Sequence, residues 1–174
     1  LQSPAARPAE TACLQSLVIL ALLGGAAPWL AVLPPADALA PLDKSDDPAI
    51  RYFSGVSTYT RTFTLPRGVR PNAGPLYLDL GAIGDVAEVR VNGRLAGTVW
   101  KAPYRIDVSG LVRRGRNALD IRVANLWVNR LIGDAQPGAT KVAYTTQPTY
   151  LPDAPLRPAG LIGPVTLQAA RERR

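Results

Sequence analysis

The chain has 174 residues, 47% of them hydrophobic, which is enough for one domain with a packed core and too few for two large domains. It contains no histidine and a single cysteine, Cys13. This composition excludes a Ser-His-Asp or Cys-His catalytic site, a histidine or thiolate zinc site, and a disulfide within the chain. We therefore expect no cofactor and no metal.

The net charge of +7 is distributed unevenly along the chain. Residues 1–50 carry two cations and five acids, a net −3, whereas residues 51–174 carry eighteen cations and eight acids, a net +10. A basic domain can bind nucleic acid or an anionic glycan. Here the cations alternate along the sequence instead of clustering, which is typical of a solvated arginine-rich surface. We therefore expect no nucleic-acid partner.

The first forty residues differ from the rest in composition. Residues 11–36 carry no charge, and within them 14–33 is long enough to cross a bilayer as a helix, although two glycines and Pro28 weaken that helix. The run "ADALA" at 36–40 has the A-x-A spacing of a signal-peptidase site.

Three interpretations of residues 1–40 stay open. They can be a secretory signal or membrane anchor, a buried or poorly ordered extension, or a segment foreign to the domain. We treat 1–40 as an apolar N-terminal extension and expect residues 41–174 to form the folded module. The first interpretation implies a secreted or periplasmic location, with membrane anchoring through 14–33 as an option.

From residue 51 onward, apolar and polar residues alternate with a period of two. The segments with this pattern are 56–65, 75–81, 86–91, 94–100, 104–108, 118–124 and 163–169. Asn92-Gly93 separates two of them and is a strong signal for a tight hairpin, because both central residues of such a turn need a positive φ. Residues 135–160 are proline-rich and show no strand pattern. The pattern predicts an all-β fold, an antiparallel β-sandwich.

The sequence resembles the galactose-binding-like jelly-roll β-sandwich of glycoside hydrolases. The resemblance covers residues 48–168 and is carried by "YFSGVSTYTRTF", "LDLGAIGDVAEVRVNGRLAGTVWKAPYRIDVSGLVRRGRNALDIRVANLWVNRLIGD" and "PAGLIGPVTL". It points to the sugar-binding-type module of family 2 enzymes and the C-terminal module of family 106 α-L-rhamnosidases. In these enzymes the module is joined to a catalytic barrel that supplies the two carboxylates of glycoside hydrolysis. Carbohydrate and such a barrel are the implied partners.

The acidic residues do not predict a catalytic pair in this chain. Four of them alternate with apolar strand residues and are interpreted as surface ion-pair partners: Asp79, Glu88, Asp107 and Asp120. Asp85 and Asp134 follow glycines in predicted loops. The chain has no room for the barrel, and we expect it to have no glycosidase activity on its own.

The stretch "VANLWVNRLIGD" at 123–134 begins as a strand and then loses its alternation. One interpretation is a corner, in which asparagine side chains satisfy backbone groups where the strand ends. In that case Trp127 covers the edge of the core, and Arg130 pairs with Asp134 to lock the following loop.

The other interpretation of this stretch is a sugar site. Sugars are bound by an aromatic face together with amide and charged groups that reach the hydroxyls. Trp127, Asn129, Arg130 and Asp134 supply that set of groups, and Trp100 and Tyr104, with Lys101, supply a second. The leading functional hypothesis is a non-catalytic module that binds carbohydrate weakly or acts as a scaffold. The alternative is a secreted or membrane-tethered protein-interaction sandwich without sugar affinity.

Overall fold

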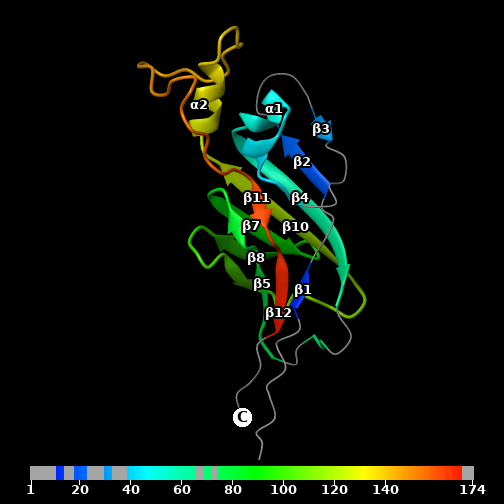
Figure 1. Cartoon of the computed structure of the whole chain (residues 1–174). Coiled ribbons are helices and arrows are strands. Elements are labelled where there is room, and N and C mark those ends of the chain that lie inside the picture. The colour runs from blue at the N-terminus through cyan, green and yellow to red at the C-terminus, as the bar shows by residue number, and fades with distance from the viewer. Residues whose placement is uncertain are drawn as a thin grey trace, which may run out of the picture.

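The computed structural model describes residues 11–13, 18–22, 30–32, 39–65, 69–71 and 74–169. The strands within these ranges are β1 (Thr11–Cys13), β2 (Val18–Leu22), β3 (Leu30–Val32), β4 (Gly55–Thr64), β5 (Leu76–Asp79), β6 (Ala82–Ile83), β7 (Val86–Val91), β8 (Arg94–Val99), β9 (Arg105–Asp107), β10 (Arg116–Asn125), β11 (Leu161–Gly163) and β12 (Thr166–Ala169). The helical segments are the 3₁₀ turn η1 (Leu42–Lys44), α1 (Pro48–Arg51) and α2 (Val128–Asp134). Figure 1 shows the strands in two layers, with α1 and α2 at one end.

The strands pair in antiparallel fashion in two main sheets. One has the order β3-β2-β4-β10-β7-β8 and the other β1-β12-β5-β9, and a short pair joins β11 to β6. The long strands β4 and β10 pair along their full length, from Gly55 opposite Asn125 to Thr64 opposite Arg116. The predicted antiparallel β-sandwich is therefore confirmed.

Alternation along the strands places the core between the two layers. In β10 the buried residues are every second one, and Leu119, Ile121 and Val123 all belong to one apolar cluster. The same cluster contains Leu78 of β5 and Leu167 of β12 from the facing sheet. Burial of each such side chain stabilises the fold by about 1.5–3 kcal/mol. The inward positions predicted from the period of two are thus the ones that hold the layers together.

The predicted hairpin at Asn92-Gly93 is present. Asn92 has φ 53° and Gly93 has φ 79°, and the turn connects β7 to β8 with Val91 opposite Arg94. The amide of Asn92 also donates to the carbonyl of Leu111 at 2.8 Å. The turn is therefore fixed by both its backbone conformation and a side-chain hydrogen bond.

Three short stretches of the N-terminal extension, 11–13, 18–22 and 30–32, are strands. β2 pairs with β4, β3 pairs with β2 at the edge of the larger sheet, and β1 pairs with β12 at the edge of the smaller one. Within the 14–33 stretch, Val18–Leu22 and Leu30–Val32 pair as antiparallel strands and are not helical. In the ranges that the structure covers, no helix is both long and apolar enough to cross a bilayer. The rest of 14–33 lies outside the described residues.

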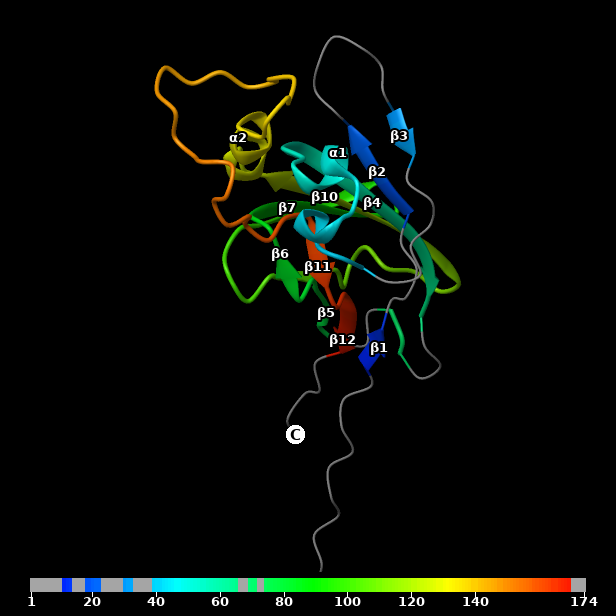
Figure 2. The same cartoon turned by 45° about the horizontal axis from the view of Figure 1, so that its top comes forward.

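Beyond β10 the chain forms α2 and then a long segment, residues 135–158, which we call the arm. Figure 2 shows α2 beside α1 at the end of the sandwich, with the arm looping outward before the chain returns to β11. The sequence predicted the loss of strand pattern here but not the helix, because its seven residues are too short to establish a period of 3.6.

Candidate functional site

The corner begins with Asn125, the last residue of β10. Its Nδ2 lies 3.2 Å from the carbonyl oxygen of Gly55 and 3.3 Å from Ser57 Oγ, and its Oδ1 accepts from the backbone N–H of Gly160 at 2.6 Å. The side chain is buried. Both the oxygen and the nitrogen of a buried side-chain amide need hydrogen-bond partners. The partners here connect the end of β10 to β4 and to Gly160, the residue that precedes β11.

Tyr59 of β4 lies below this amide and is completely buried. Its hydroxyl oxygen accepts from the backbone N–H of Leu161 at 2.9 Å. Burial raises the pKa of Tyr59 above its ordinary value of 10.0, against the lowering effect of its hydrogen bonds to Ser57 and Leu161. A Cβ on Gly160, which has φ +83°, would collide with this hydroxyl and with Leu42. Gly160 is thus required by both its conformation and its close approach.

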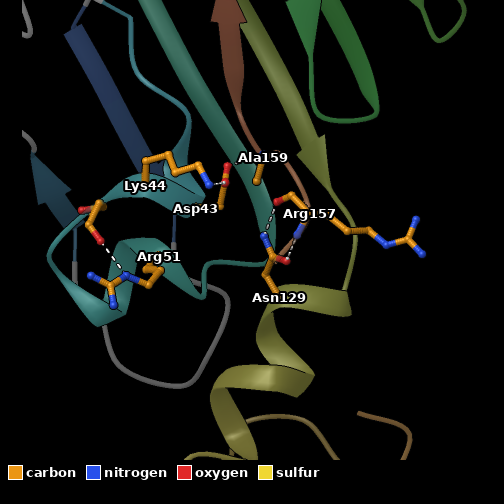
Figure 3. Close-up of polar contacts among 7 residues, drawn as sticks. Asp43, Lys44, Arg51, Asn129, Arg157 and Ala159 are labelled. Carbon is orange, nitrogen blue, oxygen red and sulfur yellow. Dashed lines mark hydrogen bonds and ion pairs between the residues drawn. The ribbon is translucent and has the colours of Figure 1, made fainter. Parts of the chain in front are cut away.

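Asn129 of α2 anchors the end of the arm. Its Nδ2 donates to the carbonyl of Arg157 at 2.7 Å, and its Oδ1 accepts from the N–H of Arg157 at 2.8 Å. Figure 3 shows this pair of bonds, with the guanidinium of Arg157 directed away from them. Nearby, the carboxylate of Asp43 accepts from the N–H of Ala159 at 3.0 Å and lies 3.4 Å from Lys44 Nζ.

Arg130 and Asp134 form an ion pair along one turn of α2. Arg130 Nη2 lies 2.8 Å from Asp134 Oδ1, and the Asp134 side chain is buried. The same carboxylate accepts from the N–H groups of Val142 and Ala143 at 3.1 and 2.8 Å. This confirms the prediction that the two residues pair and lock the following loop.

Gly133 allows α2 to dock on the segment before β4. A Cβ there would lie 2.6 Å from the Cγ of Tyr52 and 2.8 Å from Nη2 of Arg130. Tyr52 is the residue that ends α1. The run "LIGD" therefore contains both the glycine through which α2 contacts Tyr52 and the carboxylate that bonds to the arm.

Trp127 is 65% exposed, so the prediction that it covers the edge of the core is wrong. The reason is the helix that begins at Val128: the residues of α2 that are buried include Asn129, Ile132 and Gly133. A helical turn places residues three and four apart on one face, and this leaves Trp127 on the other side, in solvent.

Trp100 and Tyr104 lie in the connection between β8 and β9. Trp100 is 71% exposed, whereas Tyr104 is half-buried and packs against the main core. Neither of them lines a pocket beside α2. The structure therefore brings together Asn129, Arg130 and Asp134 on α2, with Trp127 as its N-cap residue, and leaves the second predicted set apart from the α2 pockets.

Two hollows flank α2. The corner pocket, of about 270 Å³, is lined by Ile83, Gly84, Asp85, Leu126, Val128, Asn129, Arg157, Pro158 and Ala159. The arm pocket, of about 160 Å³, is lined by Leu131, Asp134, Ala135, Lys141, Ala143, Tyr144, Thr145, Pro148, Thr149 and Tyr150. The arm residues were not among those predicted from the sequence, although Tyr144, Thr145, Thr149 and Tyr150 bring aromatic and hydroxyl groups close together along the chain.

Asp85 and Asp134, the two carboxylates predicted to lie in loops, are both engaged in hydrogen bonds, and Asp134 is in fact the last residue of α2. Asp85 Oδ2 accepts from the N–H of Leu126 at 3.1 Å, and Asp134 carries the ion pair and the two amide bonds described above. Within the described ranges, no group of three histidine, cysteine, aspartate or glutamate residues is arranged to hold a metal ion. The chemistry that this end of the molecule offers is hydrogen bonding and aromatic contact.

The chain matches a known protein family and a curated protein. The family model described as "Glycosyl hydrolase 2 galactose-binding domain-like" matches residues 41–156. A curated relative from Formosa agariphila, described as a putative beta-glucuronidase, is 46% identical over 89 residues, which are 51% of this chain and 8% of the relative.

Solved structures show the same fold. A rhamnosidase from Novosphingobium sp. PP1Y superposes with a TM-score of 0.80 and 47% identity, over 95% of this chain and 16% of that chain. The β-glucuronidase from Ruminococcus gnavus in complex with D-glucuronic acid superposes with a TM-score of 0.62 over 98% of this chain and 31% of that chain, at 17% identity, a likeness of fold alone. The chain thus spans less than a third of each of these proteins.

Proposed function

The chain belongs to the glycosyl hydrolase 2 galactose-binding-domain-like family, and from this we propose that it is a non-catalytic module of a larger glycoside hydrolase. In this role it binds carbohydrate weakly and packs against a catalytic domain. The observation that carries the proposal is the 47% identity to a rhamnosidase over 95% of this chain, which is only 16% of that enzyme. The remaining part of such an enzyme has room for the catalytic barrel that this sandwich lacks.

The carboxylates of the module support a non-catalytic role. Glycoside hydrolysis needs two carboxyl groups that face one bond, about 5–9.5 Å apart. Asp134 is buried and forms an ion pair with Arg130, and its two oxygens accept from backbone amides of the arm. A carboxylate whose oxygens are bonded within the protein in this way is not placed to face a glycosidic bond.

The surface around α2 supports carbohydrate contact. Trp127 is exposed between Leu126 and Val128, which both line the corner pocket. An exposed aromatic ring beside polar groups is the arrangement that stacks on the C–H face of a sugar. Because this surface is open, we expect dissociation constants on the order of millimolar. A secreted or periplasmic location is part of the same proposal and rests on the "ADALA" run at 36–40.

Two measurements on the 174-residue chain test the proposal. We expect no turnover of p-nitrophenyl α-L-rhamnoside or p-nitrophenyl β-D-glucuronide, and we expect weak binding of at least one glycan on an array. Turnover that disappears in Asp85→Asn, with the fold intact by circular dichroism, would make the chain an enzyme. A blank array would remove the carbohydrate role.

A second candidate function is protein interaction without sugar affinity. It is favoured by the exposed apolar side chains at this end of the molecule, which are Leu126, Trp127, Val142, Tyr144 and Leu151. Exposed apolar groups of this kind mark interaction surfaces. A blank glycan array, together with binding to a separately produced catalytic domain of a glycoside hydrolase, would select this function.

A further inference from the structure

The arm pocket is held in shape by polar side chains of α2 and its C-terminal end. Asp134 fixes one side of the arm through the N–H groups of Val142 and Ala143. Gln136 Nε2 donates to the carbonyl of Pro152 at 2.8 Å and fixes the other side. Between these two attachments the arm loops outward, and the hollow between it and α2 has Leu131 and Ala135 among its lining residues. A preformed hollow binds a ligand without the cost of ordering a loop.

The polar groups of the arm pocket have hydrogen-bonding capacity to spare. Thr145 and Thr149 both donate their hydroxyl hydrogens to the carbonyl of Gln147, at 2.7 and 3.2 Å, which leaves their oxygen lone pairs able to accept. Lys141 is exposed and forms no ion pair with any described residue. By contrast, both ends of the Asn129 amide and both oxygens of Asp134 are already bonded within the protein.

Two aromatic rings complete this set of groups. Tyr144 is 81% exposed, and Tyr150, from the far side of the same loop, is partly buried. A tyrosine presents an apolar face and a hydroxyl that both donates and accepts. A pyranoside presents the complement, a C–H face and a ring of hydroxyls. A concave hollow with aromatic surface and a few convergent polar groups is the usual form of a small-molecule site.

We infer that the arm pocket is the carbohydrate site of this module and that it binds the ring of an acidic pyranoside, a uronate. The tyrosines contact the ring, Thr145 and Thr149 accept from sugar hydroxyls, and Lys141 attracts the carboxylate. The negative charge of Asp134 is offset by Arg130, so Lys141 sets the sign of the field in the pocket. This inference rests on the proposed carbohydrate binding and assigns it to residues other than those predicted from the sequence.

Titration of the 174-residue chain with methyl β-D-glucuronide and with methyl α-L-rhamnoside, followed by NMR line shifts or calorimetry, tests the inference. We expect the glucuronide to bind severalfold more tightly than the neutral sugar at low salt. Tyr144→Ala should weaken binding of the glucuronide by about tenfold. Lys141→Gln should remove the preference between the two sugars. Leu151→Ala, an exposed apolar residue of the same arm outside the pocket, and Arg114→Gln, an exposed cation outside both pockets, are the matched controls.

The possible outcomes distinguish failure of the arm-pocket site from failure of the proposed carbohydrate binding. Glucuronide binding that Tyr144→Ala and Lys141→Gln leave unchanged, but that Trp127→Ala abolishes, would overturn the arm pocket and keep the carbohydrate role. Equal binding of both sugars by the parent chain would overturn the acidic specificity. Binding of no sugar would overturn the site and the carbohydrate role together, and would leave the family membership and the scaffold role in place.

Discussion

The side-chain amide of Asn129 forms two hydrogen bonds with the backbone of Arg157, 28 residues further along the chain. The donor bond from Nδ2 measures 2.7 Å and the acceptor bond to Oδ1 measures 2.8 Å. Together they close the loop formed by α2 and the arm, and they return the chain to β11. The side-chain amide thus satisfies the backbone N–H and C=O of Arg157, which no described strand pairs with at this point.

Asn129→Asp is expected to lower the free energy of unfolding by about 1–3 kcal/mol. The carboxylate keeps the bond from the N–H of Arg157 but loses the donor and sets an oxygen against the carbonyl of Arg157. Urea denaturation followed by tryptophan fluorescence measures the loss. Gln147→Glu makes the same amide-to-acid change at an exposed position of the arm and should be within about 0.5 kcal/mol of the parent. Equal stability of the two variants would show that the Asn129 bonds contribute nothing.

Trp127→Ala is expected to cost less than about 1 kcal/mol, because the ring is 65% exposed and leaves no cavity. A tryptophan at the edge of a core would instead cost about 3–5 kcal/mol. The midpoint and slope of urea unfolding distinguish the two cases. A loss of 3 kcal/mol or more would place the indole against the core and restore the prediction from sequence.

The strands could be predicted because the residue pattern that indicates each strand and turn lies within the strand or turn itself. Val89, Ile121 and Val123 are inward by a count of two, and Asn92-Gly93 fixes the hairpin by its own conformational preference. The Arg130–Asp134 pair was also predicted, as a contact that locks a loop, and the structure gives a further reason for it, since residues four apart on a helix are neighbours.

The exposure of Trp127 and the arm pocket could not be predicted in this way. Both depend on the rotation of α2, which is set by the contact of Gly133 with Tyr52, two residues that are distant in sequence. The pocket also depends on the hydrogen bonds that Asp134 accepts from the arm. These bonds join residues eight and nine apart in sequence, and no periodic pattern of residues indicates them. Two interpretations of the groups on α2 were open from the sequence, a structural corner and a sugar site, and in the structure Asn129 and Asp134 bind the chain itself.

Gly160→Ala is expected to destabilise the fold by about 2–4 kcal/mol, from strain at positive φ and from overlap of the new methyl group with Tyr59 and Leu42. Gly115→Ala is the matched control, because Gly115 has a similar φ of +77° and nothing within 4 Å of the added Cβ. It should show the conformational cost alone, about 1 kcal/mol. Similar losses in the two variants would contradict the close approach of Gly160 to the tyrosine.

The stability of the fold should decrease at alkaline pH partly through Tyr59. Burial raises its pKa in the folded state, so the unfolded chain releases this proton first, near pH 10, and stability falls as the pH rises toward the folded value. In Tyr59→Phe this contribution is absent, and about 1–3 kcal/mol is lost at neutral pH because the N–H of Leu161 is left without its acceptor. We therefore expect the parent and the variant to converge in stability as the pH rises above the ordinary tyrosine pKa of 10.0. Parallel pH profiles would contradict the raised pKa.

Asp134→Ala should release the arm and expose it to proteolysis. Lys141 is the only trypsin site between Arg130 and Arg157, and the peptide bond that follows it ends at the N–H of Val142, which Asp134 holds. Removal of the carboxylate also leaves Arg130 without its ion pair. The free energy of unfolding should therefore decrease by at most about 3–5 kcal/mol. Limited digestion at low temperature, followed by mass spectrometry, should show faster cleavage after Lys141 than in the parent. Asp153→Ala removes an exposed carboxylate from the same arm and should leave the cleavage rate unchanged. If Asp134→Ala and the parent are cut at the same rate while both remain folded by circular dichroism, the carboxylate does not hold the arm in solution.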